Sequence, residues 1–146
     1  MPTYTVKFSN FNLSSKQKKK IAKGITKVHS QTTGANNYFA QVIFQKNNKG
    51  SHFMGGKEVK SKEIFLNGKI RSGRSSTVKK KLINGLKMTL LKNLSINKDN
   101  IWVYLEDLIP EQMIEYGETL PKSGEEKKWF TSLPASLRKK LKKIDN

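Results

Sequence analysis

The sequence contains no cysteine among its 146 residues, which excludes disulfides, thiolate metal ligands and cysteine nucleophiles. It has only 2 histidines, and without cysteines or clustered carboxylates we expect no metal site. No apolar run is long enough to span a membrane, and the N-terminal residues lack the hydrophobic stretch of a secretion signal. We therefore predict a cytoplasmic protein with no membrane association.

Acidic residues are also scarce, with 11 against 29 lysines and arginines, which gives a formal net charge of +18. Such an excess is typical of proteins that bind nucleic acids. The lysines, however, are spread over the solvent faces of three expected helices, and no zinc-finger spacing, RNP motif or GxxG clamp accompanies them. The charge favours an anionic partner without defining it, and we do not expect that partner to be nucleic acid.

Arginine is rarer still, and Arg71, Arg74 and Arg138 are the only three in the chain. Arg71 and Arg74 lie three residues apart, between an expected strand and the start of an expected helix. Open α/β sheets bind ligands at such a position, where helix N–H groups also attract anions. Two guanidinium groups there suit a carboxylate held in a bidentate manner. The alternative interpretation is a pair of solvated surface arginines.

The hydrophobic pattern predicts a mixed α+β fold with two β-α-β units. Residues 3–9 alternate as a strand, and a helix with cap residues at 12–15 follows and ends at Gly34. The pattern then repeats, and the remaining expected elements are strands at 39–44, 64–70 and 101–105 and a helix that begins at Ser75 or Ser76. We expect one domain over 1–146, with halves at 2–46 and 62–106 and a tail at 107–146.

The remaining segments are expected to be less regular. Residues 47–62 are polar and glycine-rich and predict a loop, and residues 113–117 predict a short turn or helical piece. A last helix is expected to begin at residues 132–134. Four strands with two helices on one face leave the other face open, and we expect oligomerisation to cover it.

Four further residues are candidates for chemistry. A small residue after Met1 lets the cell remove the methionine, so the mature chain is expected to begin with the ring amine of Pro2, which can titrate near neutrality. His29 lies near the end of the first helix and is either structural or functional. Glu115, in partly apolar surroundings, is either a general base or a solvated carboxylate. Tyr104, whose strand face carries both Trp102 and a charged residue, is by default a core or interface tyrosine.

Together these residues resemble the tautomerase superfamily, whose members use an N-terminal proline on a β-α-β scaffold. Within it, the sequence is similar to the cis-3-chloroacrylic acid dehalogenase group. The resemblance covers nearly the whole chain, and the group's six functional positions all carry the same residue type here. These positions are Pro2, His29, Arg71, Arg74, Tyr104 and Glu115.

The resemblance implies a cofactor-free enzyme, active as a homotrimer, that adds water to small 2,3-unsaturated carboxylates. Arg71, Arg74 and His29 would bind the substrate carboxylate. Glu115, assisted by Tyr104, would activate the water, and the cationic amine of Pro2 would protonate the α-carbon. The product from a cis-3-haloacrylate or an acetylenic acid would be malonate semialdehyde. Segments 35–38 and 47–62 depart from the group and put the substrate in doubt.

Two other functions remain open at the level of the sequence. The first is a keto–enol tautomerase acting on a compound such as phenylpyruvate, with a neutral Pro2 as base. The second is a basic module that binds anions or nucleic acid and whose former active site is idle.

Overall fold

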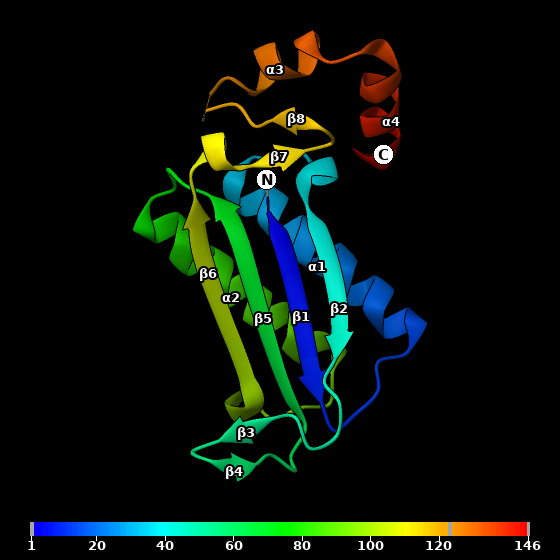
Figure 1. The fold of residues 1–146 in the computed structure, drawn as a ribbon, viewed down its shortest axis with the longest axis vertical. Helices are drawn as coiled ribbons and strands as arrows, with labels where there is room; N and C mark the ends of the chain where they lie inside the picture. Colours follow the sequence, from blue (N-terminus) through cyan, green and yellow to red (C-terminus); the bar gives the residue numbers. More distant parts are fainter. Residues whose placement is uncertain (1, 123, 146) are drawn as a thin grey trace.

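The computed structural model describes residues 2–122 and 124–145, and its centre is a four-stranded mixed sheet (Figure 1). The outer pairs, β1 with β2 and β5 with β6, are parallel, whereas the central pair, β1 with β5, is antiparallel. This arrangement confirms the predicted fold class of two β-α-β units in one sheet. In spatial order the strands are β2 (Gln41–Lys46), β1 (Thr3–Ser9), β5 (Glu63–Arg71) and β6 (Ile101–Leu108).

The first long helix, α1 (Ser15–Thr33), begins and ends as its sequence predicts. The Ser14 side chain accepts a hydrogen bond from the Gln17 backbone N–H, and the Gln17 side chain accepts one from the Ser14 N–H. This reciprocal capping box satisfies two donors that the first helical turn leaves free. Gly34 ends the helix with a left-handed φ of 73°.

The second long helix, α2 (Ser76–Asn93), begins at the other predicted cap, where Ser75 Oγ accepts from the Val78 N–H. Both helices cover the same face of the sheet (Figure 1). They also pack closely on each other, since a Cβ at Gly24 would lie 2.5 Å from Thr89 Cγ2. The main core is the layer between these helices and the sheet.

Among the described residues, no helix covers the other face of the sheet, as predicted. Ile43, Trp102 and Tyr104 point outward from it with 39%, 43% and 52% of their surface exposed. Tyr104 is therefore no core residue of the single chain. Trp102 and Tyr104 leave an apolar strip along the edge strand β6 on this face.

The tail forms a cap over the end of the sheet where β1 begins (Figure 1). We expected a turn or helical piece at 113–117, but residues 114–119 form a two-stranded hairpin, in which Tyr116 and Gly117 both take positive φ. Such a pair is the usual requirement of a tight hairpin turn. The tail consists of η3 (Pro110–Gln112), β7 (Ile114–Glu115), β8 (Glu118–Thr119), α3 (Glu126–Ser132) and α4 (Ala135–Asp145).

A second, smaller core holds this cap against the short helix η1 (Asn37–Phe39). Its centre is aromatic, with Phe39 and Trp129 ring centroids 5.5 Å apart. The cluster comprises Tyr38, Phe39, Met113, Leu120, Trp129, Leu133 and Leu141. Segment 37–39 is thereby fixed between the sheet and the tail.

The predicted loop at 47–62 is partly wrong, because it contains a small hairpin of β3 (Phe53–Met54) and β4 (Lys57–Glu58). This hairpin lies at the opposite end of the sheet from the cap (Figure 1). A further short helix, η2 (Lys98–Asn100), precedes β6. Within the described ranges, no helix is both long and apolar enough to cross a membrane.

Candidate functional site

Pro2 lies directly before β1, at the end of the sheet that the tail covers, and is buried. Its carbonyl oxygen accepts a hydrogen bond of 3.0 Å from the Gln41 N–H, so β2 fixes its backbone. In the antiparallel pairing Thr3 faces Lys69, and one further step in this register places Pro2 opposite Ile70. Pro2 is thus next to the strand end that carries Arg71.

His29 is buried with only 1% of its surface exposed, on the face of α1 that packs against the sheet. Its Nδ1 lies 2.7 Å from the hydroxyl of Tyr4, two residues after Pro2. Burial, with the positive charge of Arg74 as the next cause, lowers the pKa of His29 to about 3, so the imidazole is neutral at pH 7. Nε2 is buried and has no hydrogen-bond partner within the described part of the chain.

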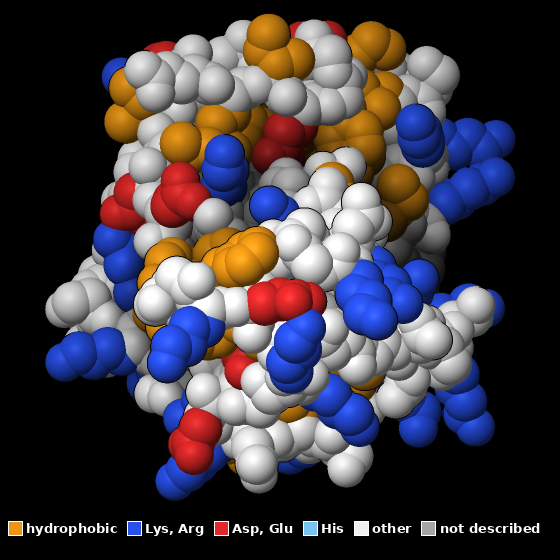
Figure 2. Space-filling model, turned by 60° about the horizontal axis from the view of Figure 1, so that its bottom comes forward, with side chains coloured by type: hydrophobic (Ala, Val, Ile, Leu, Met, Phe, Trp, Pro, Cys, Tyr) orange, Lys and Arg blue, Asp and Glu red, His pale blue; other side chains and the backbone are white. Residues whose placement is uncertain are grey.

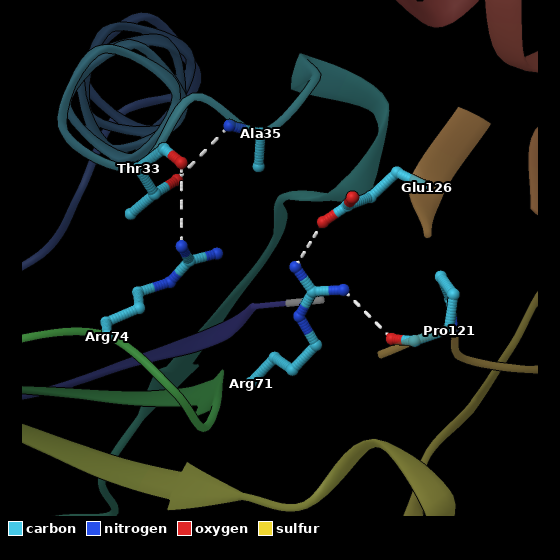
Figure 3. A network of polar contacts seen from close by, with 6 residues as sticks. All are labelled: Thr33, Ala35, Arg71, Arg74, Pro121 and Glu126. Atoms are coloured by element: carbon cyan, nitrogen blue, oxygen red, sulfur yellow. Dashed lines mark hydrogen bonds and ion pairs between the residues drawn. The ribbon is translucent and has the colours of Figure 1, made fainter. Parts of the chain in front are cut away.

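Arg71 ends β5 and is 3% exposed. Its guanidinium donates to the Pro121 carbonyl at 2.9 Å and to Glu126 Oε1 at 2.5 Å (Figure 3). An arginine this deeply buried requires a counter-charge, and Glu126 provides it from the start of α3. The tail therefore contributes directly to the arginine pair.

Arg74 lies in the turn between β5 and α2, and its guanidinium points toward the end of α1 (Figure 3). Its contact with the Thr33 carbonyl is long, at 3.5 Å. Burial and the nearby Arg71 cation lower the pKa of Arg74. Both arginines line one cavity of about 620 Å³.

This cavity combines cations with an aromatic wall. Tyr38, Phe39 and Phe130 line it together with the arginines, and Lys127 and Lys142 add positive charge. Glu126 and Asp145 are the acidic members of the lining. Such a cavity suits an anion with an apolar part.

Glu115 lies in β7 and lines a second cavity, of about 460 Å³, with Thr3. Tyr38 and Phe39 line both cavities and so stand between Glu115 and the arginines. The chain therefore brings the arginines into one cavity and places Glu115 in the next one, close to the residue that follows Pro2.

Tyr104 lies in the middle of β6 on the open face, with its ring edge against Phe65 at a centroid distance of 5.1 Å. It lines a separate cavity of about 280 Å³ with His52 and residues of the β3–β4 end. Within one chain, Tyr104 is thus not part of the cavities that hold the arginines or Glu115. The divergent segment 47–62 borders this third cavity, whereas segment 35–38 borders the arginines.

Sequence reasoning assigned no role to two residues of this site. The role of Tyr4 could have been inferred from the sequence, because Tyr4 shares the inward face of β1 with Val6 and Phe8, and a buried hydroxyl needs a hydrogen-bond partner. Glu126 has no such signal, since its contact with Arg71 joins positions 55 residues apart.

The charged side chains on one face of the molecule are mixed with other types. Lysine and arginine side chains lie singly or in small groups over the face in Figure 2, with acidic and hydrophobic side chains among them. In residues 2–122 and 124–145, no group of three or more histidine, aspartate or glutamate side chains is arranged to hold a metal ion.

Comparison with known proteins identifies the family of the chain. Residues 1–132 match the Tautomerase_3 family model, described as "Putative oxalocrotonate tautomerase enzyme". A solved structure named as N1, a member of the cis-3-chloroacrylic acid dehalogenase family, is 30% identical and superposes with a TM-score of 0.90, covering 97% of this chain and 99% of that chain. The chain belongs to the cis-3-chloroacrylic acid dehalogenase family of the tautomerase superfamily.

Other solved structures with lower sequence identity share the fold. A structure named as a fused 4-OT symmetric trimer is 20% identical, with a TM-score of 0.71 over 80% of this chain and 94% of that one. The structure named Ps01740 is 22% identical, with a TM-score of 0.72 over 77% of this chain and 99% of that one. No curated protein sequence matches the chain.

Proposed function

We propose that this tautomerase-superfamily protein adds water to small 2,3-unsaturated carboxylates, with Pro2 as general acid. The observation that carries the proposal is the arginine pair. Arg71 and Arg74 line one cavity, and Pro2 lies next to the end of β5 that carries Arg71. Guanidinium groups bind carboxylates in a bidentate manner, which fixes the acid end of a substrate. The neutral His29, whose pKa the charge of Arg74 helps to lower, would donate from Nε2 to the same carboxylate.

In this mechanism the bound carboxylate withdraws electron density from the double bond. Glu115 removes a proton from a water molecule, and the water oxygen bonds to the β-carbon. The cationic amine of Pro2, freed by removal of Met1, donates a proton to the α-carbon. With a 3-haloacrylate, the resulting halohydrin loses hydrogen halide and gives malonate semialdehyde.

Tyr104 enters this mechanism through a second copy of the chain. Its ring lies on the open face of the sheet, half exposed, and not in the cavity of its own Arg71. In a homotrimer that packs through this face, Tyr104 would assist the Glu115 of a neighbouring copy. The name of one fold relative describes it as a trimer, which supports this assembly.

The second candidate is a keto–enol tautomerase in which a neutral Pro2 is the base. Two observations favour it: the cavity of the arginines has an aromatic wall, and Glu115 lies in a different cavity. An aromatic keto acid such as phenylpyruvate would fit such a wall. The third possibility, a basic binding module, lacks a continuous cationic patch on the face of Figure 2.

An assay panel separates these functions. The substrates are cis- and trans-3-haloacrylates, an acetylenic acid and phenylpyruvate, and the proteins are the native chain and Pro2→Ala, with removal of Met1 checked by mass spectrometry. Since general acid–base catalysis contributes a factor of about 10² to 10⁴, Pro2→Ala should lose at least about a hundredfold in rate. Pro134→Ala, at an exposed position before α4, is the matched control and should keep the native rate. Equal rates for the native chain and Pro2→Ala would exclude the proline mechanism.

A second comparison identifies the reaction type. Glu115→Gln removes the proposed base for water and should abolish hydration while it leaves phenylpyruvate tautomerisation largely intact. Glu118→Gln is the control, because Glu118 faces Glu115 across the same hairpin and is exposed. Loss of both activities in Glu115→Gln would contradict separate roles for Glu115 and Pro2.

A further inference from the structure

The carboxylate of Glu126 occupies the position on Arg71 where a substrate carboxylate would bind. Its Oε1 accepts from Arg71 Nη2 at 2.5 Å, while Arg71 Nη1 donates to the Pro121 carbonyl (Figure 3). Carboxylate on guanidinium is the same pairing that the proposed function requires of the substrate. Both terminal nitrogens of Arg71 are therefore already bound within the chain, and one of them is bound to a carboxylate.

The neighbouring Arg74 is not bound in this way. Its Nη1 approaches the Thr33 carbonyl at 3.5 Å, and no carboxylate forms an ion pair with it in the ranges that the structure describes. The Nε atoms of both arginines are buried without a hydrogen-bond partner in those ranges. The two arginines of the pair thus differ, since Arg71 carries a carboxylate and Arg74 has capacity to accept one.

Glu126 is placed so that it can leave Arg71. The Arg71 side chain is 3% exposed, whereas that of Glu126 is 38% exposed and lines the cavity. Although burial opposes its ionisation, the hydrogen bond from Arg71 holds the pKa of Glu126 below its usual value, so the group is an anion at neutral pH. Glu126 can turn from the rim of the cavity into water, but the buried Arg71 then requires another anion as its counter-charge, and a substrate carboxylate would supply it.

We propose that Glu126 is a specificity-determining residue, an internal carboxylate that competes with the substrate carboxylate for Arg71. A ligand must displace Glu126 to use both arginines, so only acids that gain further contacts in the cavity bind well. This inference rests on the proposed function, because it takes Arg71 as the group that binds the substrate carboxylate.

The alternative role is that Glu126 positions Arg71 for the substrate. The two roles predict opposite signs for one measurement. Removal of a competitor tightens carboxylate binding, whereas removal of a positioning group weakens it. Glu126→Gln suits this test, since the amide oxygen can still accept from Arg71 but the negative charge is gone.

The experiment measures the binding of propionate, an unreactive three-carbon acid, by NMR titration of the backbone amides. We expect Glu126→Gln to lower the Kd of propionate about tenfold, because a competing charge is removed from the guanidinium. Glu125→Gln is the matched control, with the same charge change at the exposed neighbouring position, and should leave the Kd unchanged. Propionamide, which lacks the charge, should bind all three proteins equally.

An unchanged or higher Kd for propionate in Glu126→Gln would overturn the proposal. Circular dichroism melting checks that the variant is folded. If Glu126→Gln does not fold, Glu126→Asp is the second variant, because it keeps the charge but shortens the side chain. The same titration should then show a smaller decrease in the Kd of propionate. An unchanged or higher Kd would again refute competition.

The titration is independent of turnover, which keeps the two proposals separable. If propionate binds more tightly to Glu126→Gln but the native chain converts none of the unsaturated acids, then the proposed reaction fails and the role of Glu126 stands. If Pro2→Ala abolishes the activity of the native chain but the Kd of propionate does not fall in Glu126→Gln, then the proposed reaction stands and the competing role of Glu126 fails.

Discussion

The hydroxyl of Tyr4 and Nδ1 of His29 lie 2.7 Å apart, and both side chains are buried. Burial raises the pKa of Tyr4 and lowers that of His29 to about 3, so both groups are neutral at pH 7. When the hydroxyl donates to Nδ1, the imidazole proton resides on Nε2. Nε2 then becomes the donor that the proposed binding of a carboxylate requires.

Tyr4→Phe should therefore weaken substrate binding through His29. Loss of one buried hydrogen bond costs about 1 kcal/mol, so we expect about a fivefold rise in KM and a comparable loss of stability. The ¹⁵N shifts of the imidazole should show a mixture of tautomers in place of one form. Steady-state kinetics and NMR of the labelled protein provide both measurements.

A double-mutant cycle serves as the control for Tyr4→Phe. If Tyr4 acts through His29, the variant with both Tyr4→Phe and His29→Asn should have the same KM as His29→Asn alone. Fully additive effects on KM would show that Tyr4 acts on the substrate by another path.

The depressed pKa of His29 predicts that stability falls at mildly acidic pH. The unfolded chain binds a proton at His29 near pH 6.5, whereas the folded chain resists protonation until about pH 3. The unfolded state thus holds more protons between these values, and the free energy of unfolding decreases as the pH falls below 6.5. His29 alone contributes a slope of about 1.4 kcal/mol per pH unit at most.

Urea denaturation between pH 7 and 5 measures this slope, in a range above the titration of most carboxylates. His29→Asn removes the titrating group and should show a flatter dependence than the native chain. Parallel curves for the two proteins would mean that His29 does not titrate differently in the folded and unfolded states.

The parts of the fold that were predicted correctly depend on local signals. Ser14, Ser75 and Gly34 mark helix ends by the chemistry of one or two turns, and the alternation of β1 and β5 gives the buried face directly. The hairpin at 114–119 was mistaken for a turn or helical piece because its strands have two residues each, too few for a period. Contacts with residues outside the hairpin hold it, since Trp129 donates to the Thr119 carbonyl and Tyr116 donates to the Tyr38 carbonyl.

The candidate site likewise has a part that local signals predict and a part that they do not. Arg71 and Arg74 could be paired from their spacing of three residues at the end of a strand. Glu115 lies beyond Tyr38 and Phe39, in another cavity. This placement depends on how the tail folds over η1, and no local sequence pattern predicts that. The contact of Glu126 with Arg71 was missed for the same reason.

Gly68→Ala should disturb the site through the buried side chain of Tyr4. A Cβ at this position would lie 2.5 Å from Tyr4 Cε1 and 2.9 Å from Leu105 Cδ2, so the tyrosine ring has to move. Overpacking of this kind costs about 1–3 kcal/mol. We expect a lower melting temperature and, because Tyr4 holds His29, a higher KM.

Gly24→Ala is the control for this change. Its Cβ would lie equally close, at 2.5 Å, to Thr89 Cγ2, but between the helices and away from Tyr4. It should lower the melting temperature without raising KM. A similar rise in KM in both variants would attribute the effect to general destabilisation.

The proposed trimer, assembled through the open face of the sheet, should depend on salt. Each copy carries +18, and the repulsion among three copies extends over a Debye length of about 30 Å at 0.01 M salt but only about 3 Å at 1 M. Sedimentation velocity should show a larger trimer fraction at the higher ionic strength. An equal trimer fraction at both would exclude charge repulsion as the limit on assembly.

The position of the interface can be tested with two matched substitutions. Trp102, on the open face, and Met88, on α2, are 43% and 44% exposed, so an aspartate at either site costs little in the single chain. Both changes also reduce the net positive charge equally, which by itself favours association. Trp102→Asp should nevertheless dissociate the trimer and, with Tyr104 withdrawn from its neighbour, abolish hydration, whereas Met88→Asp should do neither. Dissociation by Met88→Asp alone would place the interface on the helical face and remove Tyr104 from the proposed mechanism.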